Sequence, residues 1–253
     1  MSRGRGHEGS YNGEPILLFT HTLAPILSHR GIKPIGRNNK YIYPKNQGYQ
    51  MVFPQFSLVH IFEFFWYFAF ISGLYFLARK NGIFESALFF LPALVWGYFV
   101  EYFGLKLYNL YYYPDHYLFY FEGVPISIAA GWAVLAFFGY YVTTNKLHVA
   151  KKVNIYSESA IFPTIVDFLI IEPLAFFLRL WVWVQNDFWF GAPLFNFVGW
   201  LFAISIYVAI YNGVTTTYKD KLQRVTAITI AIFLGMVLLQ IVGLGFIHFF
   251  GAI

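Results

Sequence analysis

Six stretches of this sequence stay largely apolar over about 20 residues or more, which limits the available folds more than any other feature. A run of that length can cross a bilayer as an α-helix, because a helix bonds every backbone N–H and C=O group internally. Charged residues make up only 11% of the chain, against roughly 25% in soluble domains. We therefore predict an all-α, polytopic transmembrane bundle with six spans: Val52–Ala78, Phe84–Tyr113, Val124–Asn145, Ala160–Gln185, Pro193–Gly213 and Val225–Gly251.

The first part of the chain differs from the rest. Residues 1–51 are polar and basic, with one short apolar run from Ile16 to Leu27 that we predict to be interfacial or re-entrant. A seventh span is the alternative. This amino terminus lacks the apolar core of a cleavable signal peptide, so the first span is predicted to direct the chain to the cell membrane. Residues 52–253 then form the transmembrane helical domain.

Basic residues alternate between the predicted connections. Lys and Arg occur in residues 79–83, 146–159 and 214–224, whereas residues 114–123 and 186–192 contain neither. The positive-inside rule places the basic connections in the cytoplasm and the other two outside. Residues 28–51 conflict with this topology, because they fall outside although they are basic. Either residues 28–51 lie outside in spite of their positive charge, or the number of spans differs by one from the predicted six.

Composition excludes several kinds of site. The chain contains no cysteine, so disulfides, thiolate metal sites and cysteine nucleophiles are excluded. The net charge of +5 is spread over the tail and the connections rather than gathered in one stripe. It therefore favours contact with membrane lipid and not with nucleic acid.

One pattern occurs twice in the chain. Gly123-Val-Pro125 is followed by Gly131-Trp132, and 68 residues later Gly191-Ala-Pro193 is followed by Gly199-Trp200 at the same spacing. Two good helix-start signals would explain the pattern without further meaning. The other interpretation is an internal duplication in parallel orientation, which places two acid-bearing hairpins around a shared cavity.

Ionisable side chains inside spans are costly and usually functional. Glu172 would share a helical stripe with Phe176, Arg179 and Trp183, and Pro173 directly after it frees a backbone carbonyl. Glu172 is then either a structural carboxylate held near Arg179 or a carboxyl group that faces a cavity. Other ionisable residues predicted within spans are His60, Glu63, Glu101, Lys106, Asp167 and His248.

The other two acids differ in their predicted surroundings. Asp167 lies five residues before Glu172, about 140° away around an ideal helix, so the pair shares a face only if proline distorts the span. Glu101 shares a face with Gly104 and Tyr108, and the glycine permits close approach of another helix. Glu101 is therefore a candidate for the bundle interior, with a structural pairing as the alternative.

Histidine and tryptophan carry weaker signals. His60 and Glu63 can meet on the first span, but His248 offers the only other imidazole within a predicted span, so we expect no metal site. Five tryptophans cluster around the two connections without Lys or Arg. They fit an interfacial aromatic belt, and they equally fit walls for a polyene or isoprenoid chain. These residues are Trp132, Trp181, Trp183, Trp189 and Trp200.

Two groups of motifs resemble the carotenoid 1,2-hydratase family, which includes bisanhydrobacterioruberin hydratase and related carotenoid biosynthesis membrane proteins. The more specific group is Asp167-Phe-Leu-Ile-Ile-Glu172-Pro173, then Trp181-Val-Trp183, then Phe190-Gly-Ala-Pro-Leu-Phe-Asn196-Phe-Val-Gly-Trp200. The weaker group is Glu101-Tyr-Phe-Gly104, Gly123-Val-Pro125 and Trp132. Together they cover roughly residues 90–210. The segment Lys106–Tyr113 departs from the small, glycine-rich turn of that family, and the basic amino-terminal region is also unlike it.

The resemblance implies a membrane hydratase, or a dehydratase in reverse, that adds water to a terminal double bond of a carotenoid or related isoprenoid. One carboxylic acid protonates the double bond and another carboxylate activates water. Glu101 and Glu172 are the candidate acid/base pair in either order, with Asp167 as the third catalytic candidate. No cofactor is expected. The candidate substrate-binding residues are Tyr108, Trp132, Trp181, Trp183, Asn196 and Trp200.

Two other functions remain open from the sequence. The chain could be a non-catalytic isoprenoid- or pigment-binding protein, or a structural subunit that assembles with membrane protein partners or with copies of itself. A transporter that uses the acids as a proton relay is the third option.

Overall fold

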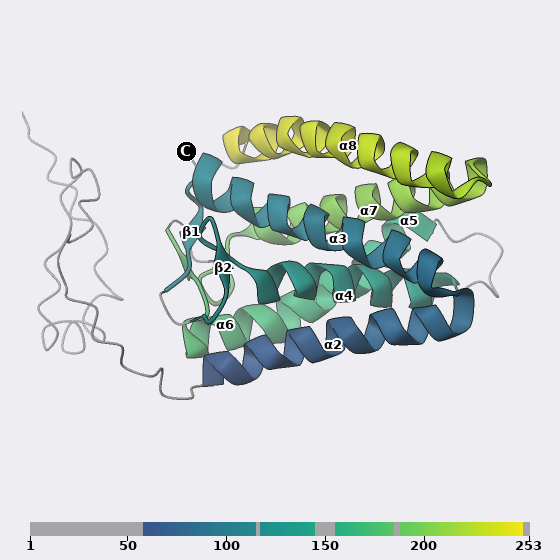
Figure 1. Ribbon diagram of the computed structural model, residues 1–253. Coiled ribbons are helices and arrows are strands. Elements are labelled where there is room, and N and C mark those ends of the chain that lie inside the picture. The colour runs from purple at the N-terminus through teal and green to yellow at the C-terminus, as the bar shows by residue number, and fades with distance from the viewer. Residues whose placement is uncertain (1–57, 115–116, 145–154, 185–187, 250–253) are drawn as a thin grey trace, which may run out of the picture. The chain divides into compact units, whose positions relative to one another are not determined.

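The computed structural model describes residues 58–114, 117–144, 155–184 and 188–249. Six helical segments run along a common direction (Figure 1), which confirms the all-α polytopic prediction. Five of them are long and apolar enough to cross a membrane, and the sixth, Ile126–Val142, is apolar but shorter. The predicted interfacial segment, the alternative seventh span and the basic stretch 28–51 lie outside the described residues.

Two of the helical segments include a five-residue π-helix. Helix α2 spans Leu58–Asn81, and α3 (Ile83–Tyr102) continues into a π-helix, η1 (Phe103–Leu107). Helix α4 is Ile126–Val142. The next segment consists of α5 (Ile155–Val166), the π-helix η3 (Asp167–Ile171) and α6 (Glu172–Leu178). Helices α7 (Leu194–Thr217) and α8 (Lys221–Phe249) complete the bundle.

Two predicted spans extend too far. The predictions Phe84–Tyr113 and Ala160–Gln185 are wrong at their carboxyl ends, because the helices stop at Leu107 and Leu178. Asn109 and Arg179 then take left-handed φ values of 50° and 53°, which turn the chain out of the helix. The segments that follow are extended and pair as two-stranded sheets. Their strands are β1 (Tyr111–Tyr112), β2 (Tyr120–Phe121), β3 (Val124–Pro125) and β4 (Val182–Trp183).

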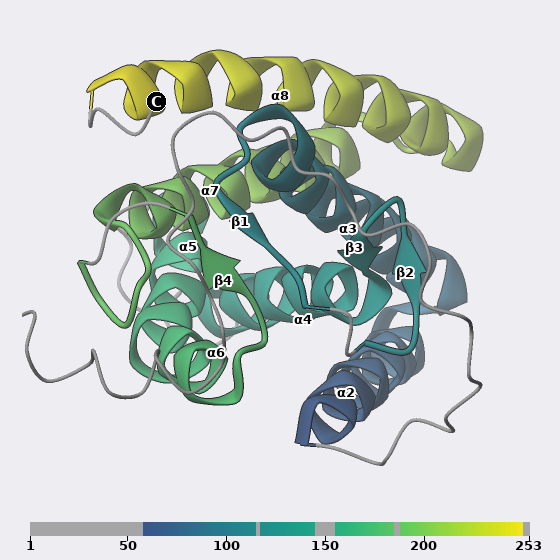
Figure 2. The same cartoon turned by 90° about the vertical axis from the view of Figure 1, so that its left-hand side faces the viewer.

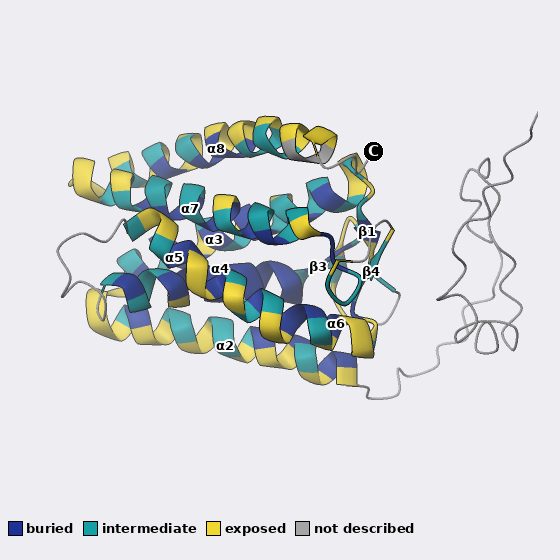
Figure 3. Ribbon diagram, turned by 180° about the vertical axis from the view of Figure 1, so that it is seen from behind, coloured by how far each residue is buried: buried dark blue, intermediate teal, exposed yellow. Residues whose placement is uncertain are grey.

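Helix α4 is the centre of the bundle. It packs against α2, α3, α5 and α7, and the end-on view places it between them (Figure 2). Small residues such as Ala129 and Ala133, both essentially buried, allow this close approach. The outer helices α2 and α8 contain many exposed residues (Figure 3). Large apolar side chains are among them, for example Phe68 on α2 and Phe233 on α8. Such an exterior suits lipid and would be unfavourable in water.

The two ends of the bundle differ in charge. Arg79 and Lys80 occupy the last turn of α2, and Lys221 and Arg224 lie in the first turn of α8. These turns lie at the end where α4 finishes and α5 begins, whereas all four strands lie at the other end (Figure 1). This arrangement agrees with the predicted alternation of basic and non-basic connections. The assignment of the basic end to the cytoplasm stays a prediction.

The repeated sequence pattern has a repeated backbone structure. Glu122 and Gly123 have φ values of 49° and 86°, and Phe190 and Gly191 have 47° and 85°. Each pair forms a tight hairpin turn whose positive φ values favour glycine. The turns are closed by the bridges Phe121↔Val124 and Trp189↔Ala192, again 68 residues apart. Pro125 and Pro193 are the residues directly before α4 and α7, rather than members of the first helical turn.

The two repeats meet through equivalent residues. The indole rings of Trp132 and Trp200 stack with 3.6 Å between their centroids and 5° between their planes. Strand β1 of the first repeat pairs with β4 of the second, with Tyr111 opposite Trp183 and Tyr112 opposite Val182. Contacts between the same positions of two copies are typical of a local twofold relation. The two repeats are therefore joined at the stacked indole rings and at the β1–β4 pair.

The absence of cysteine makes the β1–β4 register directly testable. We expect Tyr112→Cys combined with Val182→Cys to form a disulfide, because these residues face each other across an antiparallel pair. The matched control combines Tyr112→Cys with Val184→Cys. Val184 lies two residues after Val182, directly beyond β4, where its N–H donates to the Leu110 carbonyl, so it is about 7–8 Å from Tyr112 diagonally. A gel-mobility assay with and without reductant reads out both pairs. Equal cross-linking of the two pairs would contradict the register.

Candidate active site

Glu101 is held by three hydrogen-bond donors inside the bundle. It lies in the last turn of α3, and its side chain is buried. Trp132 Nε1 donates to its Oε1 at 2.7 Å, and the Tyr111 hydroxyl donates to its Oε2 at 2.6 Å. The Tyr113 hydroxyl also donates to Oε2. No Lys or Arg is among these partners, so this carboxyl group is neutralised by neither of the cations that usually pair with a buried acid.

The tyrosines come from the extended segment after η1. Alternation along this segment places Tyr111 and Tyr113 on the same side, towards Glu101. A Cβ on Gly104 would lie 2.6 Å from the Tyr111 hydroxyl oxygen, so this glycine makes room for a tyrosine ring and not for another helix. Burial, and then the nearby Glu101, raise the pKa of Tyr111 and Tyr113 well above the usual value. Both hydroxyls therefore stay protonated and available as donors.

The π-helix η3 brings Asp167 and Glu172 together. The Glu172 N–H donates to the Asp167 carbonyl, five residues back, in place of the usual four. Residues five apart then lie nearly above one another, so the 140° separation of an ideal helix does not apply. Pro173 has no N–H for the Phe168 carbonyl, and Trp189 Nε1 donates to that oxygen at 2.7 Å instead. The predicted proline distortion is thus a π-helix with a tryptophan as replacement donor.

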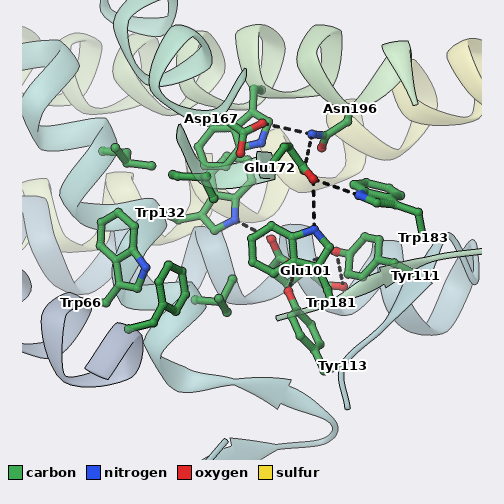
Figure 4. Close-up of a pocket in the computed structure, with 16 residues that line it drawn as sticks. Trp66, Glu101, Tyr111, Tyr113, Trp132, Asp167, Glu172, Trp181, Trp183 and Asn196 are labelled. Atoms are coloured by element: carbon green, nitrogen blue, oxygen red, sulfur yellow. Dashed lines mark hydrogen bonds between the residues drawn. The ribbon is translucent and has the colours of Figure 1, made fainter. Parts of the chain in front are cut away.

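Asn196 bridges the two acids of the second repeat. Its Nδ2 donates to Asp167 Oδ2 at 3.1 Å and to Glu172 Oε1 at 2.9 Å (Figure 4). The other oxygen of Glu172 accepts hydrogen bonds from Trp181 Nε1 at 3.3 Å and Trp183 Nε1 at 3.1 Å. Asp167 and Glu172 are almost completely buried.

The prediction that Glu172 and Trp183 lie on one face of a continuous helix is wrong. The helix ends at Leu178, and Arg179 is exposed in a left-handed conformation. Trp183 reaches Glu172 from strand β4 instead. The structural pairing of Glu172 with Arg179 is also not observed, because the only ion pair in the described part of the chain joins Arg224 and Glu85.

All three acids line one internal cavity (Figure 4). Its volume is about 50 Å³, enough for a few water molecules or the end of a branched chain. Its described lining contains no Lys, Arg or His. Five of the predicted substrate-binding residues line it as well: Trp132, Trp181, Trp183, Asn196 and Trp200.

Glu101 and Glu172 occupy corresponding places in the two repeats. Each lies nine residues after a proline inside its own helical segment, Pro92 and Pro163 respectively. This correspondence is independent of the Gly-x-Pro pattern, whose offset is 68 residues. The lining of the cavity therefore includes one matching carboxyl group from each repeat.

Tyr108 lies apart from the carboxyl groups. Its hydroxyl donates to Gln240 Oε1 on α8, and it lines a neighbouring cavity together with Glu101, Trp132 and Trp200. The expectation that Tyr108 lies near the site is thus only partly met, because it lines the adjoining space and not the acid-lined cavity itself.

Several lining residues had no role in the sequence predictions. Tyr111 and Tyr113 are the main examples, and Phe62 and Trp66 of α2 complete one wall. The run of three tyrosines was assigned to the end of the predicted span Phe84–Tyr113, and only an extended conformation there would have placed Tyr111 and Tyr113 on one side. No sequence signal marks Phe62 and Trp66 in a helix that is aromatic on every face.

The remaining ionisable residues of the predicted spans do not line the cavity that contains the three acids. Glu63 is fully buried, and the Leu118 N–H donates to its two carboxylate oxygens, at 3.1 and 2.9 Å. It therefore anchors the connection that follows the tyrosines. Lys106 and His248 are exposed. Among the described residues, no three His, Cys, Asp or Glu side chains are grouped in a way that could hold a metal ion.

Similarity to known proteins identifies the family of this chain. No curated protein and no solved structure matches it. A family model described as carotenoid biosynthesis protein matches residues 57–252, which include all six helical segments and every residue of the cavity. The match spans well over half of the sequence. The chain therefore belongs to the carotenoid biosynthesis protein family.

Proposed function

We propose that this protein is a membrane-embedded hydratase, or a dehydratase in the reverse direction, that acts on a terminal double bond of a carotenoid or related isoprenoid. The observation that carries the proposal is the convergence of Glu101, Asp167 and Glu172 in one small cavity whose described lining has no basic residue. Three carboxyl groups in such a place are not expected to be ionised together, because no cation in the described lining offsets their mutual repulsion. The site therefore combines a stored proton with negative charge.

Protonation of the double bond is the first step. We assign the proton to the Asp167–Glu172 pair. Both carboxyl groups accept a hydrogen bond from the same Asn196 nitrogen, and they resemble the pair of aspartates in aspartic proteases that shares one proton. Transfer to the less substituted alkene carbon forms a C–H bond and leaves a tertiary carbocation. The donating pair becomes fully ionised in this step.

The cavity is suited to stabilise that cation. Glu101 accepts three hydrogen bonds, the pattern expected of an ionised carboxylate, and it lines the same cavity as the acid pair. The indole rings of the lining add the attraction of aromatic faces for positive charge. Both contributions are larger in an apolar bundle than in water.

Water capture completes the reaction. Water adds to the tertiary carbon, and Glu101 is the base that takes the proton released as the C–O bond forms. Glu172 also lines a groove at the strand end of the bundle, beside Arg179 and Phe190. This groove is the proposed path for water. The proton on Glu101 returns to the ionised acid pair across the cavity that all three carboxyl groups line, which restores the starting state. The overall reaction adds one water molecule and uses no redox cofactor.

The function is tested by expressing the full chain in cells that accumulate acyclic carotenoids and analysing the pigments by mass. The expected product carries the mass of one additional water molecule per reacted end. Pigment that co-purifies unchanged with the wild-type protein, whatever the carotenoid supplied, would overturn the hydratase proposal and favour the non-catalytic binding function.

Asn196 gives a prediction specific to the acid pair. We expect Asn196→Leu to lower the rate of water addition by about 10- to 100-fold, because the two acids lose the donor that orients them together. The matched control is Asn212→Leu on the same helix, where the amide contacts only the Tyr156 hydroxyl at the surface. Initial rates with equal amounts of folded protein provide the measurement. Equal rates for the two variants would contradict the role of Asn196.

A further inference from the structure

A second, larger cavity adjoins the carboxyl site. Its volume is about 130 Å³, and it shares Glu101, Tyr111, Trp132, Trp183, Asn196 and Trp200 with the first cavity. From there it extends between η1, α7 and α8 and is lined mainly by apolar and small residues, including Phe103, Gly199, Ala203 and Leu239. The two cavities therefore lie side by side, and the residues that line both of them form the wall between them.

A third space adjoins the second cavity on the lipid-facing side of the bundle. A groove of about 480 Å³ lies between α3 and α8 and is lined by Leu91, Val95, Phe99, Ile232 and Phe233. The groove and the second cavity share Phe103 and Gln240. The Tyr108 hydroxyl donates to Gln240 at this junction. Three adjoining spaces thus extend from the acids to the outside of the helices, and side chains that line two neighbouring spaces, including the hydrogen-bonded Gln240, separate each from the next.

The small volume of the acid-lined cavity means that the rest of a long substrate must lie elsewhere. The acid-lined cavity has room for a few water molecules, so it can hold the reacting end of a chain but not a polyene. The alternative exit is the groove beside Glu172, which includes the exposed cation Arg179 and opens among the strands. An uncharged hydrocarbon is better matched by the second cavity and the α3–α8 groove, whose linings are mainly apolar.

We propose that the second cavity and the α3–α8 groove bind the polyene chain of the substrate, which enters sideways from the lipid with its terminal double bond leading. This inference rests on the proposed function for the identity of the ligand. The Tyr108–Gln240 hydrogen bond closes the path when it is empty and is displaced as the chain enters.

Gly199 offers a way to block the path without disturbing the acids. A Cβ at Gly199 meets no atom within 4 Å, so the open cavity lies directly beside it. Gly199→Phe would fill this space. Gly213→Phe is the matched control, because Gly213 lies on the same helix, is equally open, and is exposed on the surface.

The experiment measures binding separately from turnover. Full-length wild type, Gly199→Phe and Gly213→Phe are purified in detergent with lycopene, an acyclic polyene, and the retained lycopene is quantified by absorbance per folded protein. We expect Gly199→Phe to retain at least about tenfold less lycopene than wild type, and Gly213→Phe to retain the wild-type amount. The smaller Gly199→Leu substitution provides the same test if the phenylalanine variant does not fold.

The outcomes separate the two proposals. Lycopene retained by wild type and lost in the Gly199 variants supports the path even if no water is ever added, in which case only the hydratase proposal fails. Lycopene retained at the wild-type level by folded Gly199 variants overturns the path and favours the groove beside Glu172. Absence of lycopene from the wild-type protein also overturns it.

Discussion

Glu101→Gln and Glu172→Gln, made separately, will each lower water addition to an acyclic carotenoid by at least about a thousandfold, because neither amide can transfer the required proton. Both variants should still fold. In Glu101→Gln the new amide group faces the Tyr111 and Tyr113 hydroxyls, which can rotate and accept its hydrogen bonds. In Glu172→Gln the remaining oxygen can still accept from Trp181 and Trp183.

Product formed per amount of folded protein is the measurement, with mass analysis of the extracted pigment. Glu85→Gln is the matched control, because Glu85 pairs with Arg224 at the basic end of the bundle and is remote from the cavity in sequence and contacts. This control should keep the wild-type rate. Wild-type activity in either cavity variant would remove that residue from the proposed mechanism.

The largest structural effect is expected at Gly139. A Cβ at this position would lie 1.9 Å from the backbone oxygen of Ser159, so Gly139→Ala forces α4 and α5 apart. Backbone cannot move aside as a flexible side chain can, and we expect a loss of about 3 kcal/mol or more in stability. Because α5 carries the segment that leads to Asp167, activity should be lost with the packing.

The matched control is Gly213→Ala on the exposed side of α7, where the added methyl group meets no atom within 4 Å. That change should be neutral or stabilising by up to about 1 kcal/mol, because alanine favours a helix over glycine. Thermal unfolding followed by size-exclusion chromatography compares the two variants. A Gly139→Ala protein as stable as Gly213→Ala would contradict the close packing of α4 on α5.

The helical bundle could be predicted because lipid imposes a simple rule. Every spanning segment must be apolar and must satisfy its own backbone, so the apolar runs predict the helices. The same rule does not define where a helix ends. Tyr111 and Val182 are apolar enough to continue a span, and only the left-handed turns at Asn109 and Arg179 direct these segments into strands.

The candidate site was predictable in its acids but not in its geometry. Buried charge is costly, which selected Glu101, Asp167 and Glu172 from the sequence. Their relation depends on the π-helix η3, whose register an ideal helical projection cannot reproduce. The contact of Trp183 with Glu172 was not predictable either. It depends on the pairing of β4 with β1, two segments that are distant in sequence.

The most direct measurement supplies the purified full chain, in lipid, with lycopene and with water enriched in heavy oxygen. The account predicts that the product carries the heavy oxygen on a tertiary carbon, and that both glutamine variants form none of it. Wild-type protein that binds lycopene but incorporates no oxygen from water would contradict catalysis by the converging carboxyl groups.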